Sequence, residues 1–371
     1  MPKQTFERVL TLRELNRATL ARQMLLERQA LPAVTAIERL AGLQAQLPQA
    51  PYVGLWTRVL DFRRDALAES ILDYRVVKAT LMRATLHLFS ADDYLRLRTS
   101  LQPALTQAYA SIAKRRSGAE FDLEQILAAA RDYIGQAPRT FEEISAMLTA
   151  LRPASDVGAM RYGVRTHLPL VITPISSGWS YPGNPRFTLA ESVLGKPIAG
   201  QLDTKLLVHR YLAAFGPASM ADIQTWSGLP RLRDAIEALK PGLRIYGDEK
   251  GRELLDLPEM PLPAADAPAP VRFLPEFDNL LLGHSKRERI IPAEYHAHVF
   301  LSGLRVRSTI LVDGFVAGAW KIEKTKTSAR LAIEPFAPLS SKARKSLTDE
   351  AEQLVRFVEP DAKGYEVGFA E

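Results

Sequence analysis

The beginning of the chain carries apolar residues at helical spacing, with polar and charged residues between them. Residues 12–31 follow this pattern and predict a long amphipathic helix, which Pro32 ends because proline cannot continue a helix. Further helices are predicted over 33–43 and 66–71. Residues 82–89 then alternate in the manner of a strand. Helices followed by a pair of strands are typical of a winged helix.

The same outline recurs twice further along the chain. Thr140 and Ser219 each precede a predicted helix and are followed three positions later by an acidic residue, Glu143 and Asp222 respectively. Such a capping box satisfies two backbone donors at the start of a helix. A hairpin is predicted over 244–257, after the second of these boxes. We therefore predict three tandem winged-helix units, over residues 1–118, 119–200 and 201–260.

The last part of the chain has the pattern of a β-sheet. Residues 258–270 are rich in Pro and Ala and predict a stiff linker. Apolar runs on both sides of Asp313-Gly314 predict a hairpin, and a further run extends it to a meander. We predict a small β-barrel over 271–335 and a C-terminal helix within 336–371. The predicted fold class is therefore α+β.

Composition and charge narrow the possible functions. The chain of 371 residues has no Cys, which excludes disulfides, iron–sulfur clusters and a thiol nucleophile. Residues 1–116 carry 18 Lys and Arg against 10 Asp and Glu, an excess of +8 that exceeds the +6 of the whole chain, so we expect a polyanion-binding face there. No apolar stretch approaches the roughly 20 residues of a membrane helix. The N-terminus lacks the apolar core of a signal peptide, so we expect a cytoplasmic protein.

The segment from Gly42 to Pro48 is the most unusual local feature of the sequence. Because the residue before a proline avoids the helical region, the preceding helix should end near Leu43 and the chain should extend after it. In an extended segment Gln44 and Gln46 share a face, and two amides side by side can hold one water or one base edge. The same glutamines could instead cap the helix end or lie in a solvated loop.

Several motifs carry a resemblance to a known family. They are GLQAQ (42–46), MRATLHL (82–88), LPEFDN (274–279) and STILVDG (308–314), followed by a strand with Trp320. These motifs keep their order over nearly the whole chain, and in this the sequence resembles the AlkZ-like DNA glycosylases. The motif of that branch is Gln–hydrophobic–Gln, whereas the YcaQ-like branch has Asp in the second position. Gln46 places this chain on the AlkZ-like side.

The resemblance implies an architecture and an activity. The architecture is three winged helices and a β-barrel that form a C-shaped clamp around duplex DNA. The activity is hydrolysis of the N-glycosidic bond of alkylated purines, chiefly N7-alkylguanine, extending to bulky adducts and interstrand crosslinks. Gln44 and Gln46 would then be the catalytic residues. The expected partner is double-stranded DNA with alkylated purines, bound by a monomer, with no membrane involved.

Neutral amides suit this reaction. Alkylation at N7 makes the base a cation that leaves easily, so a placed water and a stabilised sugar cation matter more than a strong base. A lyase step would need an amine with a lowered pKa. No lysine lies within the glutamine motif, and Lys78 is the nearest one in a predicted strand. We therefore expect a monofunctional hydrolase.

We expect neither a metal nor any other cofactor. His284, His296 and His298 are scattered rather than arranged as ligands. The alternative to an enzyme is a winged-helix transcriptional regulator without catalytic activity. A regulator has no need for a pair of glutamines beside a proline, so the pair favours the glycosylase.

Basic residues in two regions are candidate DNA contacts. Arg83, Thr85 and His87 share one face of the strand predicted over 82–89, where they could face the DNA backbone. Arg83 could instead pair with an acidic neighbour, and His87 could be a packing residue. Arg305, Arg307, Lys321 and Lys324 are the candidates in the C-terminal unit. Tyr52, close to the glutamine pair, is a candidate for stacking on a lesion.

Overall fold

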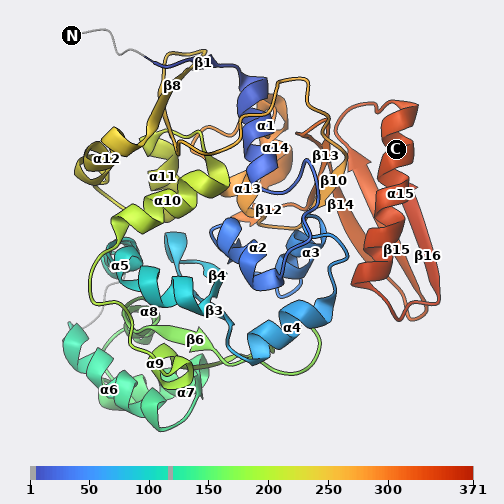
Figure 1. The fold of residues 1–371 in the computed structure, drawn as a ribbon. Helices are drawn as coiled ribbons and strands as arrows, with labels where there is room; N and C mark the ends of the chain where they lie inside the picture. The colour runs from blue at the N-terminus through green and yellow to red at the C-terminus, as the bar shows by residue number, and fades with distance from the viewer. Residues whose placement is uncertain (1–5, 116–119, 371) are drawn as a thin grey trace.

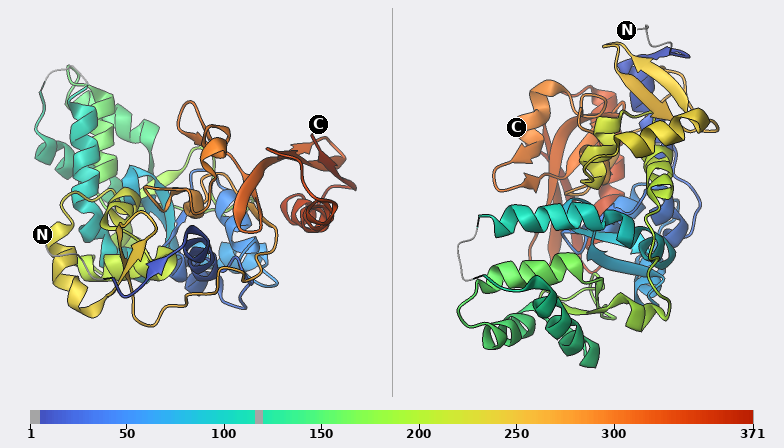
Figure 2. Two further views of the ribbon diagram at one scale, coloured as in Figure 1. Left: turned by 90° about the horizontal axis from the view of Figure 1, so that it is seen from above. Right: turned by 90° about the vertical axis from the view of Figure 1, so that its left-hand side faces the viewer.

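The computed structural model describes residues 6–115 and 120–370, and its mixture of helices and sheets confirms the predicted α+β class (Figure 1). The C-terminal sheet and α15 (Ser341–Val358) lie at one end of the molecule. The helices around α5 (Ala91–Ala113) and α6 (Leu123–Gln136) lie toward the other (Figure 2). Within the described ranges, none of the helices combines the length and hydropathy that a membrane crossing requires.

A six-stranded sheet joins the first two predicted units. Its order is β2-β4-β3-β6-β7-β5, and Ala79 pairs with Val171 where the two halves meet. The predicted boundary at residue 118 lies outside the described residues, and the strands before and after it share this sheet. The strands are β2 (Leu43–Gln44), β3 (Val76–Thr80), β4 (Leu86–Ser90), β5 (Arg139–Thr140), β6 (Leu170–Ile172) and β7 (Arg186–Leu189).

Helices cover both faces of this sheet and bury an apolar cluster on each. Because side chains alternate along a strand, Leu88 packs in one cluster and Phe89 in the other.

The predicted helix over 12–31 is shorter than expected and ends at Arg22, since Met24 has a positive φ of 55°. The remaining helices of this part are α1 (Leu12–Arg22), α2 (Ala33–Arg39), α3 (Ala50–Trp56), α4 (Arg64–Leu72), α7 (Phe141–Leu151), α8 (Val157–His167) and α9 (Ala190–Leu194).

The region of the third predicted unit contains the expected local features. The capping box at Ser219 with Asp222 is present, as predicted, and so is the one at Thr140 with Glu143 in the second predicted unit. The hairpin over 244–257 is also confirmed, and an unpredicted strand, β1 (Val9–Leu10), pairs with it in parallel. The elements here are α10 (Thr204–Phe215), α11 (Met220–Ser227), α12 (Arg233–Leu239), β8 (Arg244–Asp248) and β9 (Glu253–Asp256).

The C-terminal sheet is open, so the prediction of a β-barrel is wrong. The meander around Asp313-Gly314 is confirmed. The strand order is β10-β13-β14-β15-β16, so over the described residues β10 and β16 are the two edge strands and do not pair with each other. The helix α15 covers one face with Leu347 and Leu354. The strands are β10 (Arg272–Leu274), β13 (Thr309–Val312), β14 (Phe315–Lys324), β15 (Ser328–Pro335) and β16 (Gly364–Phe369).

The C-terminal helix predicted within 336–371 is confirmed as α15. It ends at Val358, and an unpredicted strand, β16, then returns to pair in parallel with β15. Between β10 and β13 the chain forms short helices and a small hairpin: α13 (Asn279–Leu282), α14 (His296–Val299), β11 (Phe300–Leu301) and β12 (Arg305–Val306).

The segment 258–270, predicted as a stiff linker, is hydrogen-bonded to α1. The Nε atom of Arg13 donates to the carbonyl of Ala265 at 2.8 Å, and that of Arg17 donates to the carbonyl of Ala267 at 2.7 Å. The N-terminal helix therefore anchors the connection between the two halves of the chain.

Several positive charges of the first 116 residues pair with acidic residues of the last third of the chain. Five of these arginines form ion pairs with acidic residues beyond residue 250: Arg13 and Arg17 with Asp313, Arg22 with Asp256, Arg28 with Glu350 and Arg58 with Asp278. The pairs of Arg22 and Arg58 are almost completely buried. The expected polyanion-binding face does not follow from the charge excess, because much of that excess holds the two halves of the chain together.

Candidate active site

Gln44 lies in β2, at the edge of the six-stranded sheet and opposite His87 of β4. The preceding helix ends at Arg39, and the chain turns into the strand through Ala41 and Gly42, which have φ values of 54° and +87°. A Cβ atom at Gly42 would lie 1.9 Å from the ring of Phe89, so only glycine fits this turn. The extended conformation predicted after the helix is confirmed at Leu43 and Gln44.

The amide of Asn279 holds the backbone of β2 in place. The Nδ2 atom of Asn279 donates to the carbonyl of Gly42 at 2.8 Å, and its Oδ1 atom accepts from the backbone N–H of Gln44 at 3.1 Å. Asn279 thus bonds to the free edge of β2 as a neighbouring strand would. Asn279 was not among the predicted site residues, although it belongs to the LPEFDN motif.

The Gln44 side chain is buried, and its orientation is set by Arg83. Only 7% of Gln44 is exposed. Its Oε1 atom accepts a hydrogen bond from Nη2 of Arg83 at 2.8 Å. A guanidinium can only donate, so the contact determines which end of the amide is oxygen. The Nε2 atom has no hydrogen-bond partner among the described residues.

Gln46 lies in a different environment from Gln44. Its side chain is exposed, and Oε1 accepts from the backbone N–H of Leu86 at 3.1 Å. Ala45 also pairs with this strand, through its N–H and the carbonyl of Leu86 at 2.7 Å. Each glutamine oxygen therefore accepts one bond within the protein and keeps a second lone pair for a water or a substrate.

Arg83 connects the Gln44 side chain to the backbone of Trp226. The strand predicted around Arg83 is interrupted by a turn. Residues Met82–Ala84 form a turn in which Arg83 has a φ of 54°, and β4 begins only at Leu86. The Nη1 atom of Arg83 donates to the carbonyl of Trp226 at 2.5 Å, while Nη2 binds Gln44. Burial, with a smaller contribution from Arg287, lowers the pKa of Arg83 to about 10, so it stays charged at neutral pH.

The predicted DNA-facing row of Arg83, Thr85 and His87 is not present. Thr85 is half-buried and its hydroxyl donates to the carbonyl of Met82 at 3.2 Å. His87 is fully buried, with Nδ1 bonded to the carbonyl of Thr85 at 3.0 Å, and its Nε2 has no hydrogen-bond partner in residues 6–115 and 120–370. A buried imidazole offers no surface to a phosphate. The alternative interpretation of His87 as a packing residue fits the structure.

The buried His87 predicts a loss of stability in acid. Burial, and then the charge of Arg83, lowers the pKa of His87 to about 3, whereas the unfolded side chain titrates near about 6.5. Between these values the unfolded chain binds a proton that the folded chain excludes. The free energy of unfolding should therefore fall with decreasing pH below about 6.5, by on the order of 1 kcal/mol per pH unit for this group.

Urea denaturation between pH 5 and 6.5 checks this, by comparing the wild type with His87→Leu. The variant should show a shallower slope of unfolding free energy against pH. His298→Asn is the control, because His298 is exposed, and it should keep the wild-type slope. Equal slopes for the wild type and His87→Leu would contradict the burial of a neutral imidazole.

Tyr52 does not lie where it could stack on a lesion, and this prediction is wrong. Only 1% of Tyr52 is exposed. Its ring packs edge-to-face on Trp179, with 5.1 Å between ring centroids, and its hydroxyl bonds to the hydroxyl of Ser180. The residue is part of the core beside α3 rather than of a binding surface.

The structure brings together three of the four basic candidates in the C-terminal unit. Arg307, Lys321 and Lys324 line one cavity of about 390 Å³. Arg305 is exposed on β12, where its Nε atom donates to the carbonyl of Ser302 at 3.2 Å. At the tip of this hairpin, Leu304 is 93% exposed, a feature that the sequence analysis did not single out.

The histidines considered as metal ligands do not form a site. His284 is buried and its Nε2 bonds to the carbonyl of Phe215 at 3.0 Å, while His296 contacts Arg287. Over the described residues there is no group of three or more potential metal ligands.

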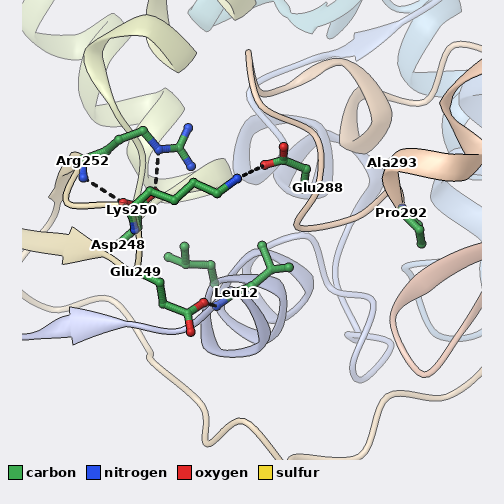
Figure 3. Close-up of a pocket in the computed structure, with 9 residues that line it drawn as sticks. Leu12, Asp248, Glu249, Lys250, Arg252, Glu288, Pro292 and Ala293 are labelled. Atoms are coloured by element: carbon green, nitrogen blue, oxygen red, sulfur yellow. Dashed lines mark hydrogen bonds and ion pairs between the residues drawn. The ribbon is translucent and has the colours of Figure 1, made fainter.

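A second cavity, of about 310 Å³, lies between α1 and the turn of the β8–β9 hairpin (Figure 3). Its charged side chains bind one another. Lys250 pairs with Glu288 at 3.4 Å, and the carboxylate of Glu249 accepts from the backbone N–H of Leu12 at 2.9 Å. This satisfied network is typical of a structural contact, so we place the candidate site at the glutamine segment instead.

Comparisons with known proteins identify the family of the chain. The model of the family described as DNA glycosylase AlkZ-like matches residues 37–357. An interstrand DNA cross-link repair glycosylase from Streptomyces sahachiroi is 26% identical over 356 residues, which cover 90% of this chain and 93% of the relative. The solved structure of the DNA glycosylase AlkZ from the same organism superimposes with a TM-score of 0.78 at 21% identity, covering 98% of this chain and all of that one. The chain belongs to the AlkZ-like DNA glycosylase family.

Proposed function

We propose that the protein is a monofunctional DNA glycosylase that hydrolyses the N-glycosidic bond of cationic N7-alkylated purines in duplex DNA. The observation that carries the proposal is the rigid Gln44–Gln46 segment, clamped by Asn279 on its backbone and by Arg83 on its side chain. The name of the Streptomyces relative supports a role in repair that extends to interstrand crosslinks.

The two glutamines would act differently because their environments differ. Gln46 is exposed and can place the attacking water with the free lone pair of its carbonyl oxygen. Gln44 is buried, and Arg83 fixes the orientation of its amide. The amide dipole could therefore stabilise the charge that develops on the sugar without reorienting during the reaction. Because the alkylated base leaves as a neutral molecule, no strong general acid is needed.

The position of Lys78 supports hydrolysis without a lyase step. Lys78 pairs with Leu88 across the sheet, whereas Gln44 pairs with His87. Since His87 and Leu88 are consecutive, Lys78 and Gln44 point to opposite faces of the sheet. Burial lowers the pKa of Lys78 to about 8, and its amino group lies 4.8 Å from the ring centroid of Tyr181. The amine is activated but faces away from the glutamines.

The surface for DNA is proposed on the C-terminal side of the molecule. Arg305, Lys321 and Lys324 are exposed there, and Arg307 is partly so. Leu304 at the hairpin tip is an apolar side chain of the kind that inserts between base pairs. We further propose that the units predicted over 1–118, 119–200 and 201–260 act as a clamp on the duplex, as a monomer and without a cofactor.

Incubation with a duplex that carries one N7-methylguanine tests this function. We expect abasic sites, revealed by strand cleavage in hot alkali, and no covalent adduct of protein and DNA after borohydride reduction. A borohydride-trapped adduct would contradict the monofunctional mechanism. Sequence-selective binding to undamaged duplex without any abasic product would instead favour the regulator.

A further inference from the structure

The cavity of about 390 Å³ in the C-terminal half lies between α3, the LPEFDN motif and β14. Its volume is within the range of about 300–1,000 Å³ that is usual for small-molecule sites. Trp320 forms part of its wall and is held by a hydrogen bond from its Nε1 to the carbonyl of Leu274 at 2.8 Å. Other lining residues are Gln49, Val53, Glu276, Arg307 and Lys324.

Glu276 differs from the other charged groups of this cavity. Arg307 pairs with Glu334, Lys321 with Glu323, and Lys324 with Glu359. Glu276 has no ion pair and no hydrogen bond to its carboxylate among the described residues. It is half-buried, and this burial alone raises the pKa of Glu276. A carboxylate that has lost water without gaining a partner is stabilised by a cation.

Two of the chain segments that line the cavity are close in sequence to residues that form or hold the glutamine segment. Gln49 follows Gln46 by three residues, and Glu276 precedes Asn279, which binds β2, by three residues. Three residues span at most about 11 Å between Cα atoms. A base that is extruded from the duplex while still attached to a sugar at Gln46 could therefore reach this cavity.

We propose that the cavity receives the extruded alkylated purine and that the carboxylate of Glu276 pairs with the positive charge of that base. The inference rests on the proposed function, since it supplies the cationic base. Enzymes that act on a base commonly take it out of the stack into a pocket. Here the unpaired carboxylate selects bases that carry a charge, and the indole of Trp320 offers a flat apolar wall beside it.

The test compares two duplexes that differ in the charge of one base. One carries N7-methyl-2′-fluoroarabinoguanine, which is cationic and resists cleavage of its glycosidic bond. The other carries 7-methyl-7-deazaguanine, which has the same shape but no charge. We expect the wild type to bind the cationic duplex about tenfold more tightly, and Glu276→Gln to bind both duplexes with the affinity of the neutral one.

Glu352→Gln is the matched control, because Glu352 is exposed on α15 and does not line the cavity, and it should keep the preference. Glu276→Gln should melt at or above the wild-type temperature, since it removes an unpaired charge. The inference is overturned if the wild type shows no preference, if Glu276→Gln keeps it, or if the variant loses affinity for both duplexes equally. Abasic-site formation by the wild type is a separate readout, so this inference can fail while the proposed function stands.

Discussion

We expect Gln44→Ala to lower the single-turnover rate of N7-methylguanine excision by a factor of about 10²–10³. The Gln44 amide is buried and oriented by Arg83, so its loss removes a group that no water can replace in the same geometry. Affinity for the lesion-bearing duplex should stay within about twofold, because we propose that this side chain acts at the reacting centre rather than on the phosphate surface. Excision under enzyme excess and binding by fluorescence anisotropy measure the two quantities.

Gln46→Ala should lower excision to a similar degree, because we propose that its carbonyl oxygen places the water. Gln353→Ala is the control, since Gln353 is an exposed glutamine of α15, far along the chain from the motif. The assignment of the catalytic pair would be wrong if both motif variants excised at the rate of the Gln353→Ala protein.

The second large effect concerns stability. We expect Arg58→Ala to reduce the free energy of unfolding by about 3–5 kcal/mol, because it leaves the carboxylate of Asp278 buried and unpaired. Arg58 binds both oxygens of Asp278, at 2.9 and 2.7 Å, and neither side chain is more than 1% exposed. Asp278 also caps α13 and directly precedes Asn279, so this ion pair supports the clamp on β2.

Urea denaturation measures the effect, with Arg63→Ala as the control. Arg63 pairs with Asp65 at 3.0 Å, but both side chains are mostly exposed, so its loss should change stability by less than about 1 kcal/mol. Similar losses in the two variants would contradict a stabilising role for the buried pair.

Features that depend on a few neighbouring residues could be predicted from the sequence. The capping boxes at Thr140 and Ser219 were predicted because the residues that close them lie three positions away. The hairpin at Asp313-Gly314 follows from the positive φ values of 48° and 82° that this dipeptide adopts readily. The extended segment at Gln44 follows in the same way from the nearby Pro48.

Features that depend on distant residues were missed. The parallel pairings of β1 with β8 and of β15 with β16 leave no local signal in the sequence, and neither does the failure of the C-terminal sheet to close. At the site, the alternation around Arg83 resembled a strand, but a backbone turn directs this side chain to Gln44. Asn279, which holds β2, is 235 residues away from Gln44.

Release of the free base tests the catalytic assignment most directly. A duplex with one N7-methylguanine is incubated with excess protein, and the released base is quantified by mass spectrometry for the wild type and for the double variant Gln44→Ala, Gln46→Ala. We predict that the wild type releases N7-methylguanine in an amount equal to the abasic strand, and that the double variant releases it at the rate seen without protein. Release by the double variant at the wild-type rate, or abasic strand formation without free N7-methylguanine, would contradict hydrolysis by the glutamine pair.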